Sequence, residues 1–407
     1  MRNKILSVLF VLFTFFVGFN ILVYNEGDKF SITENRELSR IEPLSISGWI
    51  IGSFQESVED TLADHFIARE YFVKIHNNIN ITFDKLIKMV GKVALNLSFD
   101  DKFEVSMINE DISLLTINGE KRLVRNAKEY NQETNDFIKS KIELLNSYYN
   151  QNPEVEFYSY FVISPHHSSL IYPKNNSDVL IPFIEELEFP VSFFKITSLD
   201  DIQKYFFATD HHWNHVGSYK GYYEIAKLML VEEKEILIPQ DLIYFEEVEF
   251  WGSHSRSIAH SVDVEPDDIY KYIFNLPQNS LYINGKKEDN YGNLEDYMTK
   301  TIAEKDEKGF DHYNHLNQSR KAVIKIDTGR NDLDNLLVIS DSMSNPIREL
   351  IASHFNESVF INIDIYNREV GKFNMNQYIK ENEVDNVLIF LSIDNLFPNG
   401  DIKYLSD

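Results

Sequence analysis

Three segments in the C-terminal part of the chain are almost continuously apolar: Leu336–Ile339, Val359–Ile365 and Val387–Ile393. Strands of a parallel sheet have this composition because helices cover both of their faces. Aromatic and β-branched residues mark two earlier segments, Val155–Ile163 and Val191–Thr197, as further strands. Helical patterns separate the segments, which predicts an α/β fold with a parallel sheet flanked by helices.

The composition disfavours some binding partners and excludes some kinds of catalytic and metal site. Its 407 residues carry a net charge of −25, which repels nucleic acid and anionic membrane surfaces and makes both unfavourable partners. The chain contains no cysteine, so disulfides, thiolate nucleophiles and cysteine-based zinc sites are excluded. Its length is enough for one large or two ordinary domains with a complete core.

An apolar segment near the N-terminus, Ile5–Tyr24, has the length of about 20 residues that a bilayer-spanning helix needs. Arg2 and Lys4 precede it and acidic residues follow it, so the positive-inside rule places the rest of the chain outside the cytoplasm. A cleaved signal peptide is the alternative, although no small-x-small cleavage site follows the apolar run. We therefore expect residues 1–25 to be a single-pass anchor in a bacterial cell membrane.

Two further regions follow the predicted anchor. Residues 26–95 combine an extended lead-in with a helical stretch, Ser53–Val90, in which apolar residues recur at three- and four-residue steps. Residues 96–407 contain the alternating strands and helices of the α/β domain. Within this domain, residues 254–330 are polar and lack a clear period, which predicts an irregular excursion over the sheet edge.

The sequence Asp210-His211-His212-Trp213 contains three consecutive side chains, one carboxylate and two imidazoles, that can take part in catalysis. Apolar residues at helical spacing follow it, and Asn214 is a suitable N-cap for that helix. Asp210 and His212 then lie on the turn ahead of the helix, where residues two apart project to the same side. In this arrangement Asp210 can fix the tautomer of His212 and stabilise its imidazolium form. Trp213 is expected to pack and pin the turn.

A second candidate, Ser342, follows the buried strand Leu336–Ile339 and precedes a predicted helix with Pro346 at its first position. Open α/β sheets bind their ligands at this carboxyl end of the strands. Backbone N–H groups at the helix start could hold a developing oxyanion. A serine hydroxyl is a weak nucleophile unless an imidazole lies within hydrogen-bond reach, and His212 is our candidate for that base.

These residues also have simpler interpretations. Asp210 could cap a turn, and Ser342 could cap the helix that follows it. A metal site is another alternative, with Asp210, His211, His212 and His215 as the ligands. Two other places where serine and histidine are neighbours are Ser164–His167 and Ser253–Ser255. They are weaker candidates, because triads are assembled in space rather than from sequence neighbours.

The same residues carry a resemblance to a known family. Asp210–Trp213 resembles the signature of the DHHW protein family, whose members are similar to alginate O-acetylation proteins with SGNH-hydrolase-like domains. Further segments resemble other parts of that family: Glu34–Arg36, Asp64–Phe66, Phe161–Pro165, Phe250–Ser253 and Val338–Ser342. The matches cover nearly all of the chain after the predicted anchor. The resemblance implies an SGNH-hydrolase-like parallel sheet flanked by helices and preceded by one transmembrane helix.

By this resemblance Ser342 is the nucleophile, His212 is the base and Asp210 is the acid that orients the base. The family's nucleophile block has Gly where this chain has Ser340, so a side chain there could crowd the turn or line the site. The candidates for oxyanion or substrate contacts are Ser340, Asn345 and Arg256. No metal and no cofactor is implied.

The resemblance also implies an activity. It is that of a membrane-anchored, extracytoplasmic O-acyltransferase that moves an acetyl group onto a hydroxyl of a cell-surface or secreted polysaccharide. A multi-spanning membrane O-acyltransferase would deliver the acyl group. Two alternatives use the same fold: a carbohydrate esterase with water as the acceptor, and a non-catalytic polysaccharide-binding scaffold.

Overall fold

The computed structural model describes residues 11–12, 15–16, 18, 30–31, 36–65, 69–94, 103–127, 130–173, 177–246, 248–288, 312–313, 317 and 321–405. The predicted anchor, Ile5–Tyr24, lies largely outside these residues. Among the residues described, no helix is both long enough and apolar enough to cross a bilayer.

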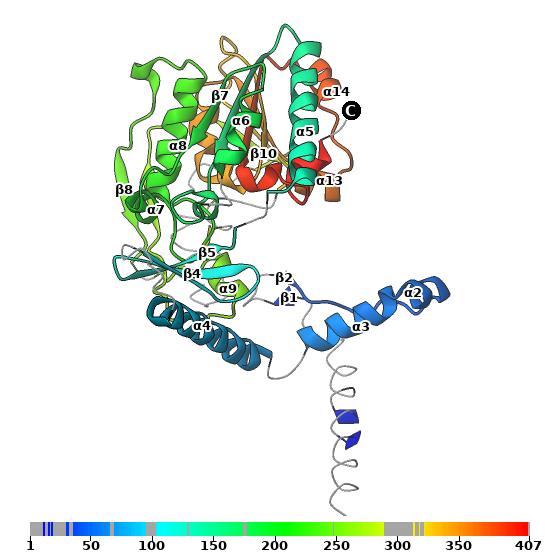
Figure 1. The fold of residues 1–407 in the computed structure, drawn as a ribbon. Helices are drawn as coiled ribbons and strands as arrows, with labels where there is room; N and C mark the ends of the chain where they lie inside the picture. Colours follow the sequence, from blue (N-terminus) through cyan, green and yellow to red (C-terminus); the bar gives the residue numbers. More distant parts are fainter. Residues whose placement is uncertain are drawn as a thin grey trace, which may run out of the picture.

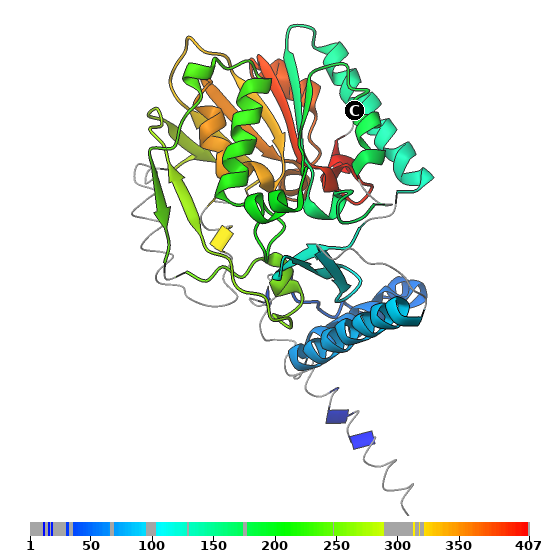
Figure 2. The same cartoon turned by 60° about the vertical axis from the view of Figure 1, so that its left-hand side comes forward.

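A mixed eight-stranded sheet lies at the centre of the α/β domain (Figure 1 and Figure 2). Its strand order is β11-β10-β12-β14-β13-β15-β6-β7, and the five strands from β14 to β7 are parallel. Their bounds are β14 Glu357–Asn362, β13 Leu336–Ser340, β15 Asn386–Ser392, β6 Glu156–Val162 and β7 Val191–Phe194. Each overlaps the segment that predicted it. β14 ends earlier than expected because the Asn362 side chain accepts the N–H of Ile365 and caps a helix.

Helices cover both faces of the parallel strands, as the apolar segments predict. On one face lie α5 Gln132–Gln151, α6 Ile181–Ile184, α13 Ile363–Glu369 and α14 Met375–Glu381. On the other lie α8 His215–Leu228 and α12 Arg348–Ala352. Each face of the sheet packs against its helices in a separate hydrophobic core, and β13 contributes to both. Leu337 packs in the core beneath α5, and its neighbour Val338 packs in the core beneath α8. This layering confirms the α/β class and the predicted flanking helices.

The remaining edge of the large sheet is antiparallel, so the sheet is mixed rather than parallel throughout. β10 Ser280–Ile283, β11 Lys286–Lys287 and β12 Val323–Asp327 form this edge. The helix α9 Ser253–Ser257 and the paired strands β8 Asp241–Tyr244 and β9 Tyr270–Ile273 precede it. Where the described residues cover the region 254–330, they thus include regular elements in place of the expected irregular path, and most of residues 289–320 lie outside the described residues. Short edge strands with one solvated face carry many polar residues, and their sequences therefore resemble loops.

A smaller sheet separates the large sheet from the N-terminal helices (Figure 1). Its strands are β3 Phe103–Met107, β4 Ile112–Ile117 and β5 Glu120–Arg125. The predicted helical stretch Ser53–Val90 forms two helices, α3 Ser53–Asp64 and α4 Arg69–Ala94. The other elements are β1 Phe30–Ser31, β2 Arg36–Glu37, α2 Ile46–Ile51, α7 Leu199–Tyr205 and the 3-10 segments Pro165–His167, Ser177–Val179, Glu233–Glu235, Ser342–Ile347, Ile393–Leu396 and Asp401–Tyr404.

Candidate active site

The Asp210–Trp213 turn lies between α7 and α8. Asn214 caps α8 as expected, since its side-chain oxygen accepts the N–H groups of Val216 and Gly217, each over 3.0 Å. Trp213 is buried, and its ring packs against Phe194. Trp213 therefore pins the turn and leaves the two residues before it fixed at the start of α8.

The Ser342 turn connects β13 to a 3-10 segment, Ser342–Ile347, rather than directly to the α-helix expected at Pro346. Asp341 caps that segment, because its Oδ1 accepts the N–H of Met343 over 2.9 Å. Its Oδ2 accepts the N–H of Ser392 and an amide N–H of Asn395, each over 2.6 Å. Asp341 thus ties the turn to the carboxyl end of the neighbouring strand β15.

The two turns bring Asp210, His212 and Ser342 into one hydrogen-bonded chain. His212 Nδ1 lies 2.5 Å from Asp210 Oδ1, and His212 Nε2 lies 2.8 Å from Ser342 Oγ. A carboxylate only accepts, so Nδ1 carries the proton and Nε2 is left to accept from the serine O–H. The chain of contacts has the geometry of an activated serine.

The Asp210 carboxylate is held as a charged group. Its Oδ1 also accepts the N–H of His212 over 2.9 Å, and its Oδ2 accepts the N–H of Ser253 over 2.5 Å. Burial alone would raise the pKa of this carboxyl. The imidazoles of His212 and His211 and the guanidinium of Arg256 outweigh that effect and hold the pKa of Asp210 well below its usual range. Asp210 therefore stays ionised and able to orient His212.

His211 points to a different partner. Its Nδ1 lies 2.8 Å from the hydroxyl of Ser253, and its pKa is held well below 6.5 by burial and by the adjacent His212. Ligand atoms of Asp210, His211 and His212 lie within 4.8 Å of one another and could hold a cation. His215, the fourth residue of the alternative metal site, instead lies against Tyr270 at a ring distance of 4.9 Å.

Tyr313 also contacts the site, although no sequence pattern points to it. Its ring stacks on His212 with centroids 3.8 Å apart and an angle of 14° between the planes. Its hydroxyl donates to the carbonyl oxygen of Ser342 over 2.9 Å. One side chain therefore contacts both the imidazole and the backbone of the serine. Nothing in the polar stretch around it marks this tyrosine as different from its neighbours.

Replacing Tyr313 separates its two contacts. Tyr313→Phe keeps the ring on His212 but loses the hydrogen bond to Ser342, which is worth about 1 kcal/mol, or roughly fivefold in the rate at which the Ser342 hydroxyl reacts with an electrophile. Tyr313→Ala removes the ring as well and should slow that reaction by about a hundredfold, because the ring that holds the imidazole in position is gone. Burst kinetics with an activated ester measure both. Equal rates in all three proteins would contradict a positioning role.

The expected oxyanion and substrate candidates lie in different environments. Ser340 is buried, and its oxygen accepts the hydroxyl of Ser344 over 3.0 Å. Arg256 donates to the carbonyl oxygen of Trp251 over 2.6 Å, and its positive charge helps to lower the pKa of Asp210. Asn345 is half-buried in the turn that begins at Ser342. Asp341 accepts the N–H groups of the two residues after Ser342, over 2.9 and 3.3 Å, so these groups are already engaged.

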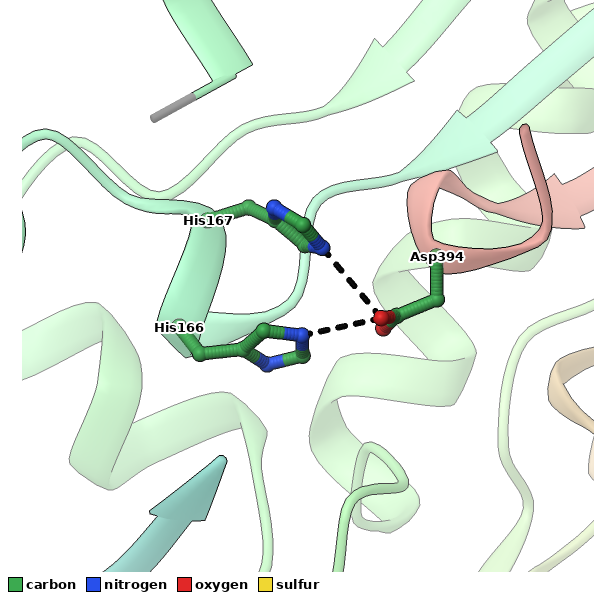
Figure 3. Close-up of side chains that lie close together, drawn as sticks. All are labelled: His166, His167 and Asp394. Carbon is green, nitrogen blue, oxygen red and sulfur yellow. Dashed lines mark hydrogen bonds and ion pairs between the residues drawn. The ribbon is translucent and has the colours of Figure 1, made fainter. Parts of the chain in front are cut away.

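A second histidine–aspartate cluster lies at the carboxyl ends of β6 and β15 (Figure 3). Nε2 of His166 and Nε2 of His167 lie 3.0 and 3.3 Å from the same oxygen of Asp394. The hydroxyl of Tyr130 lies 2.8 Å from Nδ1 of His167. Burial lowers the pKa of His166 to about 3, so its ring is neutral. The three ligand atoms could hold a cation such as zinc, and the sequence did not connect these histidines with an aspartate more than 200 residues away.

A cavity of about 10 Å³ lies between the two histidine clusters, lined by His166, His211 and His254 among others. His254 is buried, and its Nδ1 lies 3.1 Å from the carbonyl oxygen of Leu123, so this nitrogen carries a proton. Burial, with the charge of Arg125 in the same direction, lowers the pKa of His254 from 6.5 to about 4.

His254 should make the fold sensitive to acid. In the unfolded chain His254 binds a proton below its ordinary pKa of 6.5, whereas in the folded protein it binds that proton only below about pH 4. This group therefore contributes its full stability above pH 6.5 and loses it as the pH falls, in total about 3 kcal/mol. Between about pH 7 and about pH 4.5, the free energy of unfolding measured in urea should fall by about 2 to 3 kcal/mol more for the natural protein than for His254→Gln. Equal decreases in the two proteins would contradict the assignment of the acid sensitivity to His254.

A larger cavity of about 590 Å³ opens beside the triad. Aromatic side chains dominate its wall, including Trp213, Phe250, Tyr270 and Tyr313, and Lys271, Glu349 and Asn279 add polar groups. Tyr313 connects the cavity to the triad, because the same ring stacks on His212. A wall of aromatic faces with a few polar groups suits a ligand that has both apolar faces and hydroxyls.

Comparison with known proteins identifies the fold. No family model and no curated protein matches the sequence. A DHHW family protein from Eubacterium siraeum aligns with a TM-score of 0.53 at 16% identity, over 75% of this chain and 99% of that one. PatB1 from Bacillus cereus, carrying a sulfonyl adduct, aligns with a TM-score of 0.55 at 20% identity, over 74% of this chain and 100% of that one.

A third solved structure is more distant. The O-acetyltransferase domain of Pseudomonas putida AlgJ aligns with a TM-score of 0.37 at 8% identity, over 75% of this chain and 96% of that one. The resemblance that the Asp210–Trp213 sequence suggests is confirmed at the level of the fold, since a DHHW family protein is among the structural neighbours. At these identities the first two structures establish a shared fold.

Proposed function

We propose that this protein is an O-acyltransferase that acetylates hydroxyls of a cell-surface or secreted polysaccharide through Ser342, His212 and Asp210. The observation that carries the proposal is the continuous contact from Asp210 Oδ1 through the imidazole to Ser342 Oγ, over 2.5 and 2.8 Å. The simpler interpretation of Asp210 and Ser342 as caps would not require an imidazole between them. The SGNH-like character of the domain is part of the same proposal.

The reaction has two halves. Ser342 Oγ attacks the acyl carbon of the donor while its proton passes to His212 Nε2, and the imidazolium then protonates the leaving group. In the second half His212 removes the proton of a sugar hydroxyl, which attacks the acyl carbon of the ester and releases Ser342 with that proton. The charged Asp210 stabilises the imidazolium in both halves, and no metal or cofactor takes part.

The aromatic cavity beside the triad supports a carbohydrate acceptor. Sugar rings stack their C–H faces on aromatic side chains and use their hydroxyls for hydrogen bonds, which matches its mixed wall. We further propose that the chain is anchored in the membrane by Ile5–Tyr24 with this domain outside the cytoplasm, and that a multi-spanning acyltransferase supplies the acyl group.

The test is to incubate the protein with an activated acetyl ester and to search for acetyl mass on Ser342. A transferase should hold this acyl group until a sugar acceptor is added, whereas an esterase should release it to water. A scaffold should show no added mass. A chelator should leave the reaction unchanged, and a loss of activity that zinc restores would favour the metal alternative instead.

A further inference from the structure

Helix α4, Arg69–Ala94, is attached to the rest of the molecule by a mainly polar face. Asn77 donates to the hydroxyl of Ser261 over 2.9 Å, and Asn80 donates to the carbonyl oxygen of Ile108 over 2.9 Å. Lys88 forms hydrogen bonds with Asp84 and with the carbonyl oxygen of Val105. Of the apolar residues on the helix, Ile81 packs against the core beneath it. The helix thus lies on the outside of the small sheet, away from the large one (Figure 1 and Figure 2).

The opposite face of α4 is apolar and exposed. Seven of its residues recur at steps of one, three or four and are 36 to 68% exposed: Phe72, Ile75, Ile79, Phe83, Leu86, Ile87 and Val90. Together they form a stripe along about five turns of the helix, which we call the outer stripe. A helix of a soluble domain normally turns such a stripe toward the core, so its outward direction indicates an apolar environment on that side.

The charge of α4 is opposite to that of the whole chain. The helix contains Arg69, Lys74, Lys85, Lys88 and Lys92 against Glu70 and Asp84, so five positive minus two negative charges give +3, whereas the chain carries −25. An amphipathic helix with a basic polar side binds in the plane of a bilayer surface, with its apolar face among the acyl chains. The net charge of the chain disfavours an anionic surface, but α4 is the part that such a surface would attract.

A second surface near α4 in sequence has the same character. The short helix α2 exposes Ile46, Trp49, Ile50 and Ile51, each by more than half. Tryptophan is enriched where protein meets the headgroup layer of a membrane. Both helices follow the apolar segment Ile5–Tyr24 in the sequence, which would keep a bilayer within reach of them.

We propose that α4 lies in the interfacial layer of an anionic lipid bilayer, with the outer stripe inserted among the acyl chains. The segment Gly252–Ser261 connects this helix to the triad, because the N–H of Ser253 is bound by Asp210 and Ser261 is bound by Asn77. Seating α4 in the bilayer therefore holds the active site close to the membrane surface. An acyl group delivered from within the membrane would then have a short path to Ser342, and this consequence alone rests on the proposed function.

The absence of cysteine allows a single-site test on the full chain. Phe83 in the outer stripe and Val370 on the α/β domain are equally exposed, at 59% each, and are both apolar. Phe83→Cys and Val370→Cys are labelled with a fluorophore and reconstituted into vesicles of phosphatidylcholine and phosphatidylglycerol. Quenching is measured with nitroxide-bearing lipid and with aqueous iodide.

The label at 83 should be quenched several-fold more by the lipid than by iodide, and the label at 370 should show the reverse. Lys74→Glu with Lys85→Glu should weaken lipid quenching at 83, as should the omission of phosphatidylglycerol. Iodide quenching at 83 equal to that at 370 would overturn the proposal. Protection of 83 from both quenchers would also overturn it, because a second copy of the chain or a protein partner would then cover the outer stripe. Neither result bears on acylation of Ser342.

Discussion

A Ser342→Ala protein is expected to lose acyl transfer almost completely and to fold normally. The hydroxyl is the atom that we expect to carry the acyl group, and alanine offers no replacement for it. Removal of a triad nucleophile lowers turnover by a factor on the order of a thousand or more. The side chain is half-buried, and His212 is a hydrogen-bond partner that stays in place through Asp210 and Tyr313. Thermal unfolding should therefore change little.

Two measurements check this expectation together. Acetyl mass on the purified protein reports the first half of the reaction, and acetyl content of the polysaccharide in cells reports the whole. Ser344→Ala is the matched control, because Ser344 lies in the same turn but bonds to Ser340 rather than to the imidazole. His212→Ala should resemble Ser342→Ala. Normal acetylation by the Ser342→Ala protein would remove the basis of the proposed mechanism.

The parts of the site that could be predicted from sequence are those set by local patterns. An apolar strand followed by small polar residues places Ser342 at the carboxyl end of β13, and a helix cap at Asn214 places Asp210 and His212 ahead of α8. Each pattern determines where its residues stand within one element. The proximity of His212 and Ser342, 130 residues apart, is a hypothesis that depends on how β13 and α8 pack, and the 2.8 Å contact supports it.

Other parts depend on contacts that no local pattern encodes. Tyr313 is one of many polar or aromatic residues in its stretch, and its role arises because it stacks on His212. The pairing of His166 and His167 with Asp394 joins the ends of two strands that are neighbours only in the folded sheet. β10, beside the two-residue edge strand β11, is only partly buried except at Leu281, so its sequence lacks the continuous apolar run that identified β13.

Gly252→Ala is expected to disable the site without touching any catalytic side chain. Gly252 has φ −70°, which any residue can adopt, so the effect of the change is steric. A Cβ added here would lie 2.3 Å from Cβ of Asp210 and 2.6 Å from the carbonyl oxygen of Thr209. Carbon atoms in contact normally lie about 3.5 to 4.0 Å apart. The backbone at Gly252 or Asp210 must therefore move.

The displacement would break the contact that holds the acid of the triad. The N–H of Ser253 donates to Asp210 Oδ2 over 2.5 Å, and a hydrogen bond to a charged group contributes about 1.5 to 3 kcal/mol. A shift of about 1 Å in a catalytic group can slow a reaction by about a hundredfold. We expect acylation of Ser342 to fall by at least that factor and the unfolding temperature to drop.

Ser253→Ala separates this effect from loss of the neighbouring side chain. That variant keeps the backbone N–H on Asp210 and loses only the hydroxyl contact with His211, so its activity should fall far less. If Gly252→Ala acts through the carboxylate, combining it with Asp210→Asn should add little to the loss caused by Asp210→Asn alone. Fully additive losses in the double variant would show instead that Gly252 acts on the site by a route that does not pass through Asp210.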